Sequence, residues 1–203
     1  MTSQTEIKAY DKFAKQYTQY SYSRLPQFEL DHFISLLPKK ANVLDIACGP
    51  GRDVEYLVKE GFAVTGIDLS KKLIDEAKKK VKSKKATFKV MDVEKLRLKK
   101  ESFDGIWCYN ASVHMSKGKI RQIIEKFSHL LKEEGVLFFD FLEGEKDKKV
   151  RSIEVGNMPR KFTVFDQVEI ESILKEEGFY INSMTNVRVD NMSWINVFAR
   201  KLS

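Results

Sequence analysis

A glycine-rich loop between a short apolar segment and a helix-like stretch is the feature of this sequence best suited to chemistry. The segment from Val43 to Ala47 is apolar apart from Asp45, and Gly49-Pro50-Gly51 follows it closely. Glycines after a strand let the backbone turn sharply and approach a ligand closely. The helix that follows presents free N–H groups and the positive end of its dipole. Such a loop suits a nucleotide-like ligand that carries an anionic part.

Two details narrow the identity of that ligand. Val54 stands where a dinucleotide-binding fold requires its third glycine or alanine, so the NAD fingerprint fails and the pattern D-x-x-x-G-x-G remains. Asp45 lies within an otherwise apolar strand, where a carboxylate is costly to bury unless hydrogen-bond donors surround it. We expect Asp45 either to order the glycine loop by accepting its N–H groups or to reach an ammonium group of the ligand through water.

The segment from Val43 to Arg52 resembles motif I of the class I S-adenosylmethionine-dependent methyltransferases, and later segments agree in order and spacing. Asp68 follows the second strand, where the family carries a carboxylate that takes both ribose hydroxyls. Met91-Asp92-Val93 is similar to the segment that lines adenine. The likeness is greatest to small stand-alone microbial enzymes that act on metabolites, among them relatives of quinone-biosynthesis enzymes. It implies S-adenosylmethionine as cofactor and no metal. The cofactor contacts that the resemblance implies are Tyr17, Tyr22, Arg24, Asp45, Ala47, Gly49, Gly51, Arg52, Asp68, Leu69, Asp92, Val93 and Tyr109.

Methyl transfer is an in-line displacement at an activated sulfonium methyl, so the protein mainly positions the nucleophile and excludes water. A general base is needed only where the nucleophile must lose a proton. Ligands of parallel sheets bind beyond the carboxyl ends of the strands, so residues 109–114 are expected to face the methyl group. His114 is the candidate base, because the unperturbed pKa of histidine lies near neutrality. The alternative is that His114 caps a turn or binds the backbone.

The N-terminal segment is rich in aromatic residues at helical spacing. The pattern predicts one helix over residues 6–20 and another over residues 27–37. One interpretation is a helix that packs on the flank of the sheet. In the enzymes that this chain resembles, the segment instead folds over the cofactor as a lid, which places Tyr17, Tyr22 and Arg24 near the methionine end. Aromatic faces favour a cationic sulfonium, and Arg24 would pair with the methionine carboxylate.

Apolar and amphipathic segments alternate from residue 42 onward. Strands are expected at residues 43–47, 63–67, 87–91, 103–109 and 136–141, and the helices between them end near residues 60, 81 and 135. Such alternation implies parallel strands with right-handed crossovers. Asp166 with Glu169 resembles a capping box that opens a helix to residue 178. The last two strands, at residues 180–189 and 193–199, must be antiparallel because their connection is short.

The predicted fold is therefore a Rossmann-like, doubly wound α/β sheet, mostly parallel, with a C-terminal antiparallel hairpin. We expect one methyltransferase domain over residues 1–203, divided into a helical lid (1–38), a cofactor-binding core (39–142) and an acceptor-side part (143–203). Two cysteines do not make a disulfide framework, which favours a reduced, cytoplasmic setting. No apolar run approaches the ~20 residues that a membrane span needs.

The positive charge of the chain is unevenly distributed. Its formal net charge is +7, and residues 71–100 hold 13 Lys and Arg against 4 Asp and Glu. Such a block raises a nucleic-acid substrate as a second interpretation. The block precedes strands and so belongs at the edge opposite the ligand, where a solvated charged face explains it.

The preferred acceptor is therefore a small molecule that receives the methyl group on an O, N, S or C atom. The segments expected to select it are residues 10–24, the surroundings of His114, and residues 143–165. An RNA- or protein-directed methyltransferase and a cofactor-binding domain without catalysis stay open as alternatives.

Overall fold

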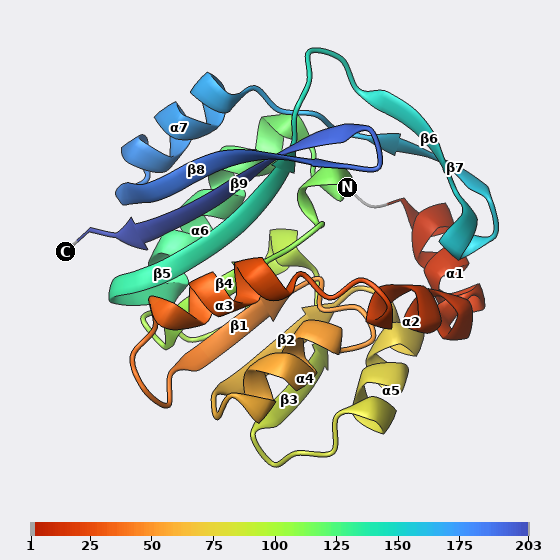
Figure 1. Cartoon of the computed structure of the whole chain (residues 1–203), viewed down its shortest axis with the longest axis horizontal. Coiled ribbons are helices and arrows are strands. Elements are labelled where there is room, and N and C mark those ends of the chain that lie inside the picture. Colours follow the sequence, from red (N-terminus) through yellow and green to blue (C-terminus); the bar gives the residue numbers. More distant parts are fainter. Residues whose placement is uncertain (1–2, 203) are drawn as a thin grey trace.

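The computed structural model describes residues 3–202, and its centre is a seven-stranded sheet in the order β3-β2-β1-β4-β5-β9-β8 (Figure 1). Strands β1 to β5 are parallel, β9 runs antiparallel to β5, and β8 runs antiparallel to β9. This arrangement confirms the predicted α/β class, including the C-terminal hairpin. The strands are β1 (Asn42–Ile46), β2 (Ala63–Asp68), β3 (Ala86–Val90), β4 (Phe103–Cys108), β5 (Leu131–Leu142), β8 (Phe179–Val189) and β9 (Met192–Lys201).

Helices cover both faces of this sheet. On one face, α3 (Gln27–Ser35), α4 (Arg52–Lys59) and α5 (Lys71–Lys80) pack on a core that includes Phe33, Leu57 and Ile74. On the other face, α6 (Ile120–Leu130) and α7 (Gln167–Glu176) pack on a core that includes Phe127 and Leu174. Apolar side chains at helical spacing thus turn towards the sheet, which holds the parallel strands and their carboxyl ends in place.

Helix caps appear where the sequence predicts them. The Ser70 side chain accepts from the Leu73 amide and begins α5, and the Asp166 side chain accepts from the amides of Val168 and Glu169 and begins α7. These oxygens satisfy backbone donors that the first helical turn leaves unpaired. The cap on α5 also fixes the backbone just after β2, beside the candidate site.

The N-terminal segment forms two helices where the periodicity predicts one. Helix α1 (Gln4–Lys12) ends at Phe13, and α2 (Ala14–Tyr22) begins after it. The Phe13 ring packs on Gly156, so closely that a Cβ at that glycine would clash with the ring. The break therefore coincides with a contact to a segment more than 100 residues away, which periodicity does not detect.

Residues 143–165, for which no strand is expected from the sequence, contain a second sheet. Strands β6 (Lys148–Ser152) and β7 (Met158–Phe162) pair antiparallel and pack beside Leu142 and Val113. A further difference concerns α6, which ends at Leu130 and not near residue 135. Leu131 is fully buried and pairs with Phe103, so β5 begins there and is longer than predicted.

The two cysteines are free and buried, as their positions in a turn and a strand predict. Burial raises the pKa of both the Cys48 and the Cys108 thiols well above the usual value, so these side chains act as small apolar groups. Among the helices within residues 3–202, none is long and apolar enough to cross a membrane.

Candidate active site

A cavity of about 460 Å³ lies at the edge of the sheet where the parallel strands end. The loops after β1, β2, β3 and β4 line it on one side, and α1, α2 and the β6–β7 hairpin line it on the other. Figure 1 shows these two helices and the hairpin together beyond the carboxyl ends of the strands. The lining holds eight Asp and Glu side chains and five Lys and Arg side chains, so its formal charge is negative.

The glycine loop places backbone amides at the floor of this cavity. Gly49 (φ 54°) lines the cavity, as does Ala47 (φ 56°), and both lie in the left-handed region. Gly51 (φ 85°) is the N-cap of α4 and packs on α5, where a Cβ would stand 3.0 Å from the Ala77 Cβ. The Gly51 conformation therefore shapes the loop, while Gly49 faces the ligand space.

Asp68 lies at the end of β2 and joins the glycine loop to α5. Its Oδ2 accepts from the Gly49 amide at 2.9 Å, and its Oδ1 accepts from the Ser70 amide at 2.7 Å. Burial raises the pKa of this carboxyl to about 6, against the opposing effect of the backbone hydrogen bonds. Each carboxylate oxygen has a second lone pair that remains available to a donor in the cavity.

The third strand contributes its part of the lining through the residues that follow it. Asp92 begins a short 3-10 helix, η1 (Val93–Lys95), by accepting from the Glu94 amide at 2.9 Å. Asp92 and Val93 both line the cavity, and so does Leu69 after β2. Residues that follow three separate strands thus meet at the floor of the cavity, where the sequence predicts them.

Asp45 lies beneath this floor and is not part of the lining. Its side chain is 2% exposed, and its Oδ2 has no hydrogen-bond partner among residues 3–202. Burial raises the pKa of the Asp45 carboxyl well above its usual value, and the nearby negative charge of Asp53 raises it further. The expectation that donors surround this carboxylate is therefore not met at Oδ2.

The Arg52 guanidinium is bound by other groups of the protein and does not face the cavity freely. Its guanidinium forms two hydrogen bonds to Asp53, at 2.6 and 2.8 Å, and donates to the carbonyls of Ser21 and Arg24. The Trp107 indole donates to the same Asp53 carboxylate at 3.0 Å. These contacts tie the start of α4 to the end of α2, so Arg52 positions the lid, although it also borders the cavity.

The three predicted lid contacts have different positions. Tyr17 lines the cavity next to Gly49, and burial raises the pKa of its hydroxyl to about 12, so it is a neutral donor. Tyr22 lies outside the lining, where its hydroxyl donates to the Pro50 carbonyl at 3.5 Å. Arg24 borders the cavity and pairs with Asp190 at 2.6 Å, with both side chains about half exposed.

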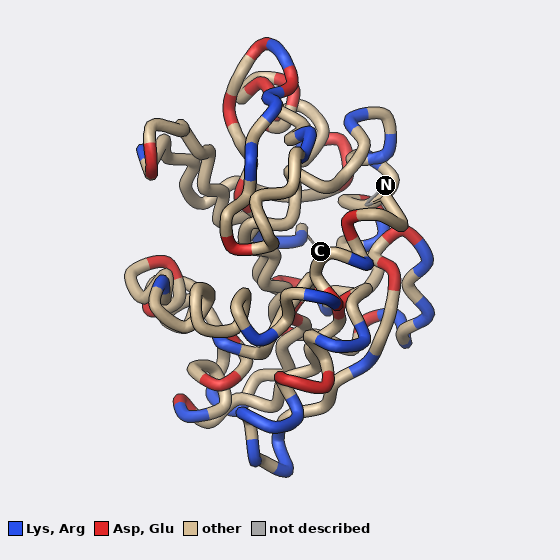
Figure 2. The backbone as a smooth tube through the Cα atoms, turned by 90° about the vertical axis from the view of Figure 1, so that its right-hand side faces the viewer, with Lys and Arg blue, Asp and Glu red and all other residues tan. Residues whose placement is uncertain are grey.

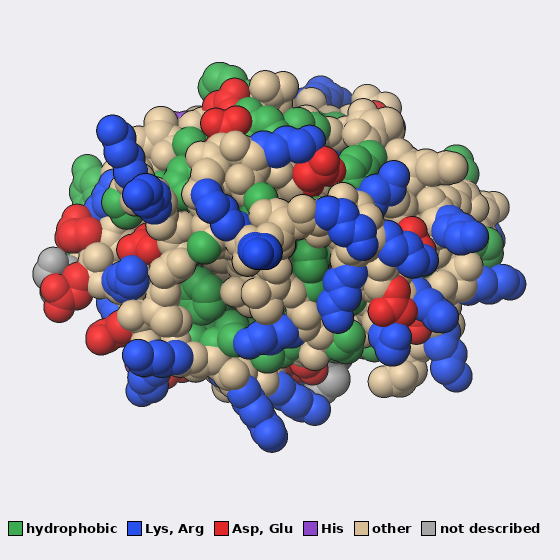
Figure 3. All heavy atoms as spheres, turned by 90° about the horizontal axis from the view of Figure 1, so that it is seen from below, with side chains coloured by type: hydrophobic (Ala, Val, Ile, Leu, Met, Phe, Trp, Pro, Cys, Tyr) green, Lys and Arg blue, Asp and Glu red, His purple; other side chains and the backbone are tan. Residues whose placement is uncertain are grey.

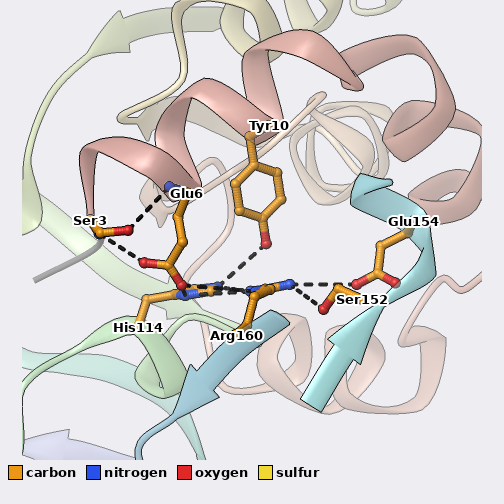
Figure 4. Close-up of polar contacts among 7 residues, drawn as sticks. All are labelled: Ser3, Glu6, Tyr10, His114, Ser152, Glu154 and Arg160. Carbon is orange, nitrogen blue, oxygen red and sulfur yellow. Dashed lines mark hydrogen bonds and ion pairs between the residues drawn. The ribbon is translucent and has the colours of Figure 1, made fainter. Parts of the chain in front are cut away.

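A polar cluster around Arg160 forms another part of the cavity wall (Figure 4). Arg160 lies on β7 and is only 6% exposed. Its Nη1 donates to the Ser152 hydroxyl at 2.9 Å, its Nη2 donates to His114 Nε2 at 2.5 Å, and Glu154 lies 3.5 Å from Nη1. The Nε atom has no hydrogen-bond partner among the described residues, and Glu6 lies 4.0 Å from it. Arg160 thus joins the hairpin to the short turn η2 (Ser112–His114) and to α1.

His114 faces the cavity, as predicted, but its surroundings disfavour the expected base role. Burial and the adjacent Arg160 charge lower the pKa of its imidazole to about 3. A guanidinium only donates hydrogen bonds, so His114 Nε2 must accept and the proton belongs on Nδ1, 4.0 Å from Glu6. The Tyr10 hydroxyl lies 3.4 Å from the same Nε2. This geometry favours a structural role, but through the Arg160 side chain and not through the turn cap or backbone contact that the sequence suggests.

Sequence reasoning included Arg160 only as part of residues 143–165 and did not propose Asp140, although both line the cavity. Asp140 lies near the end of β5, is 2% exposed, and accepts from the Asn110 amide at 2.7 Å through Oδ1. Burial raises the pKa of the Asp140 carboxyl to about 8. Its interruption of the longest apolar run is the signal that could have identified it, whereas Arg160 carries no comparable local signal.

Within the described part of the chain, no group of three or more His, Cys, Asp or Glu side chains is arranged to hold a metal ion. Of the Lys and Arg residues in the block at 71–100, Lys95 lines the cavity, and the others lie outside the lining, on α5, on β3 and in the loops that precede β3 and β4. Figure 2 marks Lys and Arg positions along the lower part of the backbone, and Figure 3 shows Lys and Arg side chains spread over the face seen from below.

Comparisons with known proteins agree with the fold. Residues 43–135 match the family described as a methyltransferase domain. A ubiquinone biosynthesis O-methyltransferase of Coxiella burnetii is 35% identical over 103 residues, which cover 50% of this chain and 43% of that protein. A SAM-dependent methyltransferase structure from Methanosarcina mazei has a TM-score of 0.73 at 20% identity, and covers 88% of this chain and 98% of that one.

A second solved structure was determined with ligands. It is the 1,6-didemethyltoxoflavin-N1-methyltransferase of Burkholderia thailandensis, with 1,6-didemethyltoxoflavin and S-adenosylhomocysteine bound. Its TM-score is 0.70 at 19% identity, and the match covers 86% of this chain and 77% of that one. At such identities the likeness shows the fold. The chain spans about half the length of the curated relatives it matches.

Proposed function

We propose that this chain, which belongs to the class I S-adenosylmethionine-dependent methyltransferases, transfers a methyl group to an O, N, S or C atom of a small-molecule acceptor. The observation that carries the proposal is the cavity floor, where Asp68, the Gly49 amide and Asp92 converge at three adjacent strand ends. A carboxylate with free lone pairs at the end of β2 suits a ligand with neighbouring hydroxyl groups, such as a ribose.

The residues present fit the family's cofactor. The negative formal charge of the lining suits a ligand whose sulfonium and ammonium groups outweigh its carboxylate. The ring of Tyr17 beside Gly49 offers an aromatic face, which favours a sulfonium cation. The buried Oδ2 of Asp45, without a partner, lies beneath the loop that would hold the amino-acid end.

The bound cofactor supplies a methyl group that is already activated by the positive charge on sulfur. The chain's own task is to bind, to orient and to exclude water. Asp68 and Asp92 bind, the glycine loop sets the position, and α1, α2 and the β6–β7 hairpin cover the cavity. Arg160, held by His114 and Ser152, fixes the wall on the acceptor side.

A small acceptor is supported by the cavity itself. Its volume lies within the range of about 300–1,000 Å³ that is typical of small-molecule sites. The lid and the hairpin cover part of the cavity, and of the basic block at residues 71–100 only Lys95 lines it. A protein- or RNA-directed enzyme would need that lid to move away.

The proposal is tested by ligand binding and then by turnover. S-adenosylhomocysteine, and not NAD, is expected to raise the thermal midpoint, because ligand at 100 times its Kd adds about 2.7 kcal/mol of stability. Labelled methyl groups are then followed into a metabolite panel, an RNA pool and a peptide pool. Stabilisation by NAD alone contradicts the cofactor, and label that enters only RNA or peptide contradicts the acceptor class.

A further inference from the structure

Helix α1 covers the cavity without being part of the hydrophobic core. None of its described residues is buried, although Ile7 and Tyr10 line the cavity. Most helices of globular proteins are stabilised by an apolar face packed on the core. Helix α1 is held instead by contacts of the Tyr10 ring with Tyr17 and Arg160 and by a few polar contacts, so individual hydrogen bonds help to set its position over the cavity.

Those contacts fall on two different parts of the protein. Towards the acceptor wall, Glu6 and Tyr10 point at His114 and Arg160, as Figure 4 shows. Towards the cofactor floor, the Asp11 carboxylate accepts from the Ser70 hydroxyl at 2.6 Å and from the Lys72 amide at 3.1 Å. Asp11 therefore reaches out of its own helix to the first residues of α5.

Ser70 is the residue through which this contact reaches the cofactor floor. Its Oγ accepts from the Leu73 amide as the N-cap of α5, and its hydroxyl proton goes to Asp11. Its amide donates to Asp68, whose other oxygen accepts from Gly49. One chain of hydrogen bonds thus runs from α1 through Ser70 and Asp68 to the glycine loop.

We infer that Asp11 is a positioning residue that fastens α1 over the bound cofactor by holding Ser70, the neighbour of the cofactor-binding Asp68. This inference rests on the proposed function. When Asp11 loses its charge, the closed position of α1 is less populated, and the apparent affinity for a ligand under the lid falls by the same factor. Helix α5 keeps its own cap, because Ser70 still accepts from Leu73.

The experiment measures S-adenosylhomocysteine binding by calorimetry in the full chain and in Asp11→Asn. We expect binding about tenfold weaker in the variant, the effect of one hydrogen bond to a charged group. Asp75→Asn is the matched control, because Asp75 lies on α5, the helix that Asp11 contacts, but pairs with the exposed Lys71 away from the cavity. The control is expected to bind with unchanged affinity.

A second measurement separates lid closure from general destabilisation. Trypsin can cut α1 and α2 after the exposed Lys8, Lys12 and Lys15. Saturating S-adenosylhomocysteine is expected to slow these cuts several-fold in the parent protein and in Asp75→Asn, and much less in Asp11→Asn. In the Ser70→Ala background, Asp11→Asn is expected to have little further effect on affinity.

Each outcome decides the inference. Equal affinity and equal protection in the parent protein and Asp11→Asn overturn it while the proposed function stands. Weaker binding without any change in protection overturns the lid role. Absence of binding to the parent protein overturns the proposed function, and the inference with it.

Discussion

The buried imidazole of His114 makes a quantitative prediction about the pH dependence of stability. Its pKa is about 3 in the folded protein, because burial and Arg160 disfavour the charged form, and 6.5 is the usual value for an unfolded chain. A histidine with a depressed folded pKa costs stability as pH falls below the unfolded value, because the unfolded chain then binds the proton and the folded chain does not. From pH 7.5 to pH 5, these two values correspond to about 2 kcal/mol of lost stability.

The perturbation that isolates this effect is His114→Gln. The glutamine carbonyl can still accept from Arg160 Nη2, but it does not titrate between pH 5 and 7.5. Urea unfolding of both proteins at pH 7.5 and pH 5 measures the difference. We expect the variant to lose about 2 kcal/mol less than the parent protein over this interval, whatever its stability at pH 7.5.

His129→Gln is the control, because His129 is a histidine on α6 outside the cavity lining. The reasoning is refuted if the parent protein and His114→Gln lose the same free energy of unfolding between the two pH values. That result would also restore His114 as a candidate base near neutrality. A difference of about 2 kcal/mol would mean that this imidazole stays neutral and serves as an acceptor for Arg160.

Three further predictions concern the floor and the end of β5. Asp68→Ala is expected to weaken S-adenosylhomocysteine binding at least tenfold in calorimetry, since hydrogen bonds to a charged group are worth about 1.5–3 kcal/mol each; unchanged affinity would remove Asp68 from the site. The Asp140 carboxyl has a folded pKa of about 8, raised from 3.8, so the parent protein loses stability as pH rises through this interval. Asp140→Asn removes this titration. Between pH 5 and pH 8, the parent protein is therefore expected to lose a few kcal/mol more free energy of unfolding than the variant, as measured by urea unfolding; parallel pH profiles would contradict this. Gly51→Ala places a side chain at φ 85° and 3.0 Å from the Ala77 Cβ, so we expect a loss of about 1–2 kcal/mol in the same assay, and an unchanged midpoint would show that the loop relaxes.

The sequence predicts the sheet and the cavity floor well because the relevant signals are local. Ala47, Gly49 and Gly51 lie within five consecutive residues, and Asp68 directly precedes Leu69 and the Ser70 cap. A strand, a turn and a helix fix the relative positions of such neighbours, and parallel pairing then brings successive strand ends together. The residues that line the cavity floor follow from this register alone.

Other residues lie differently from expectation where a contact outside the local segment decides the position. Tyr22 turns to the outside of the glycine loop, because its hydroxyl meets the Pro50 carbonyl. Arg52 is directed away from a ligand by its neighbour Asp53 and by two carbonyls of the lid. The helix break at Phe13 coincides with packing of the Phe13 ring on Gly156, far along the chain. None of these partners stands out in the sequence by its residue type or spacing.

The cavity wall around Arg160 cannot be predicted from local sequence signals for the same reason. It combines α1, η2 and the β6–β7 hairpin, so that Tyr10 and Arg160 meet at His114 across 104 and 46 residues. The hairpin carries no clear alternation, and its pairing is stabilised by packing of Phe162 and Val150 beside Leu142. Two chains with the same glycine loop can therefore bind the same cofactor and still present different acceptor walls. Residues of this wall must then be found from tertiary contacts such as those of Arg160, and the glycine loop by itself does not determine them.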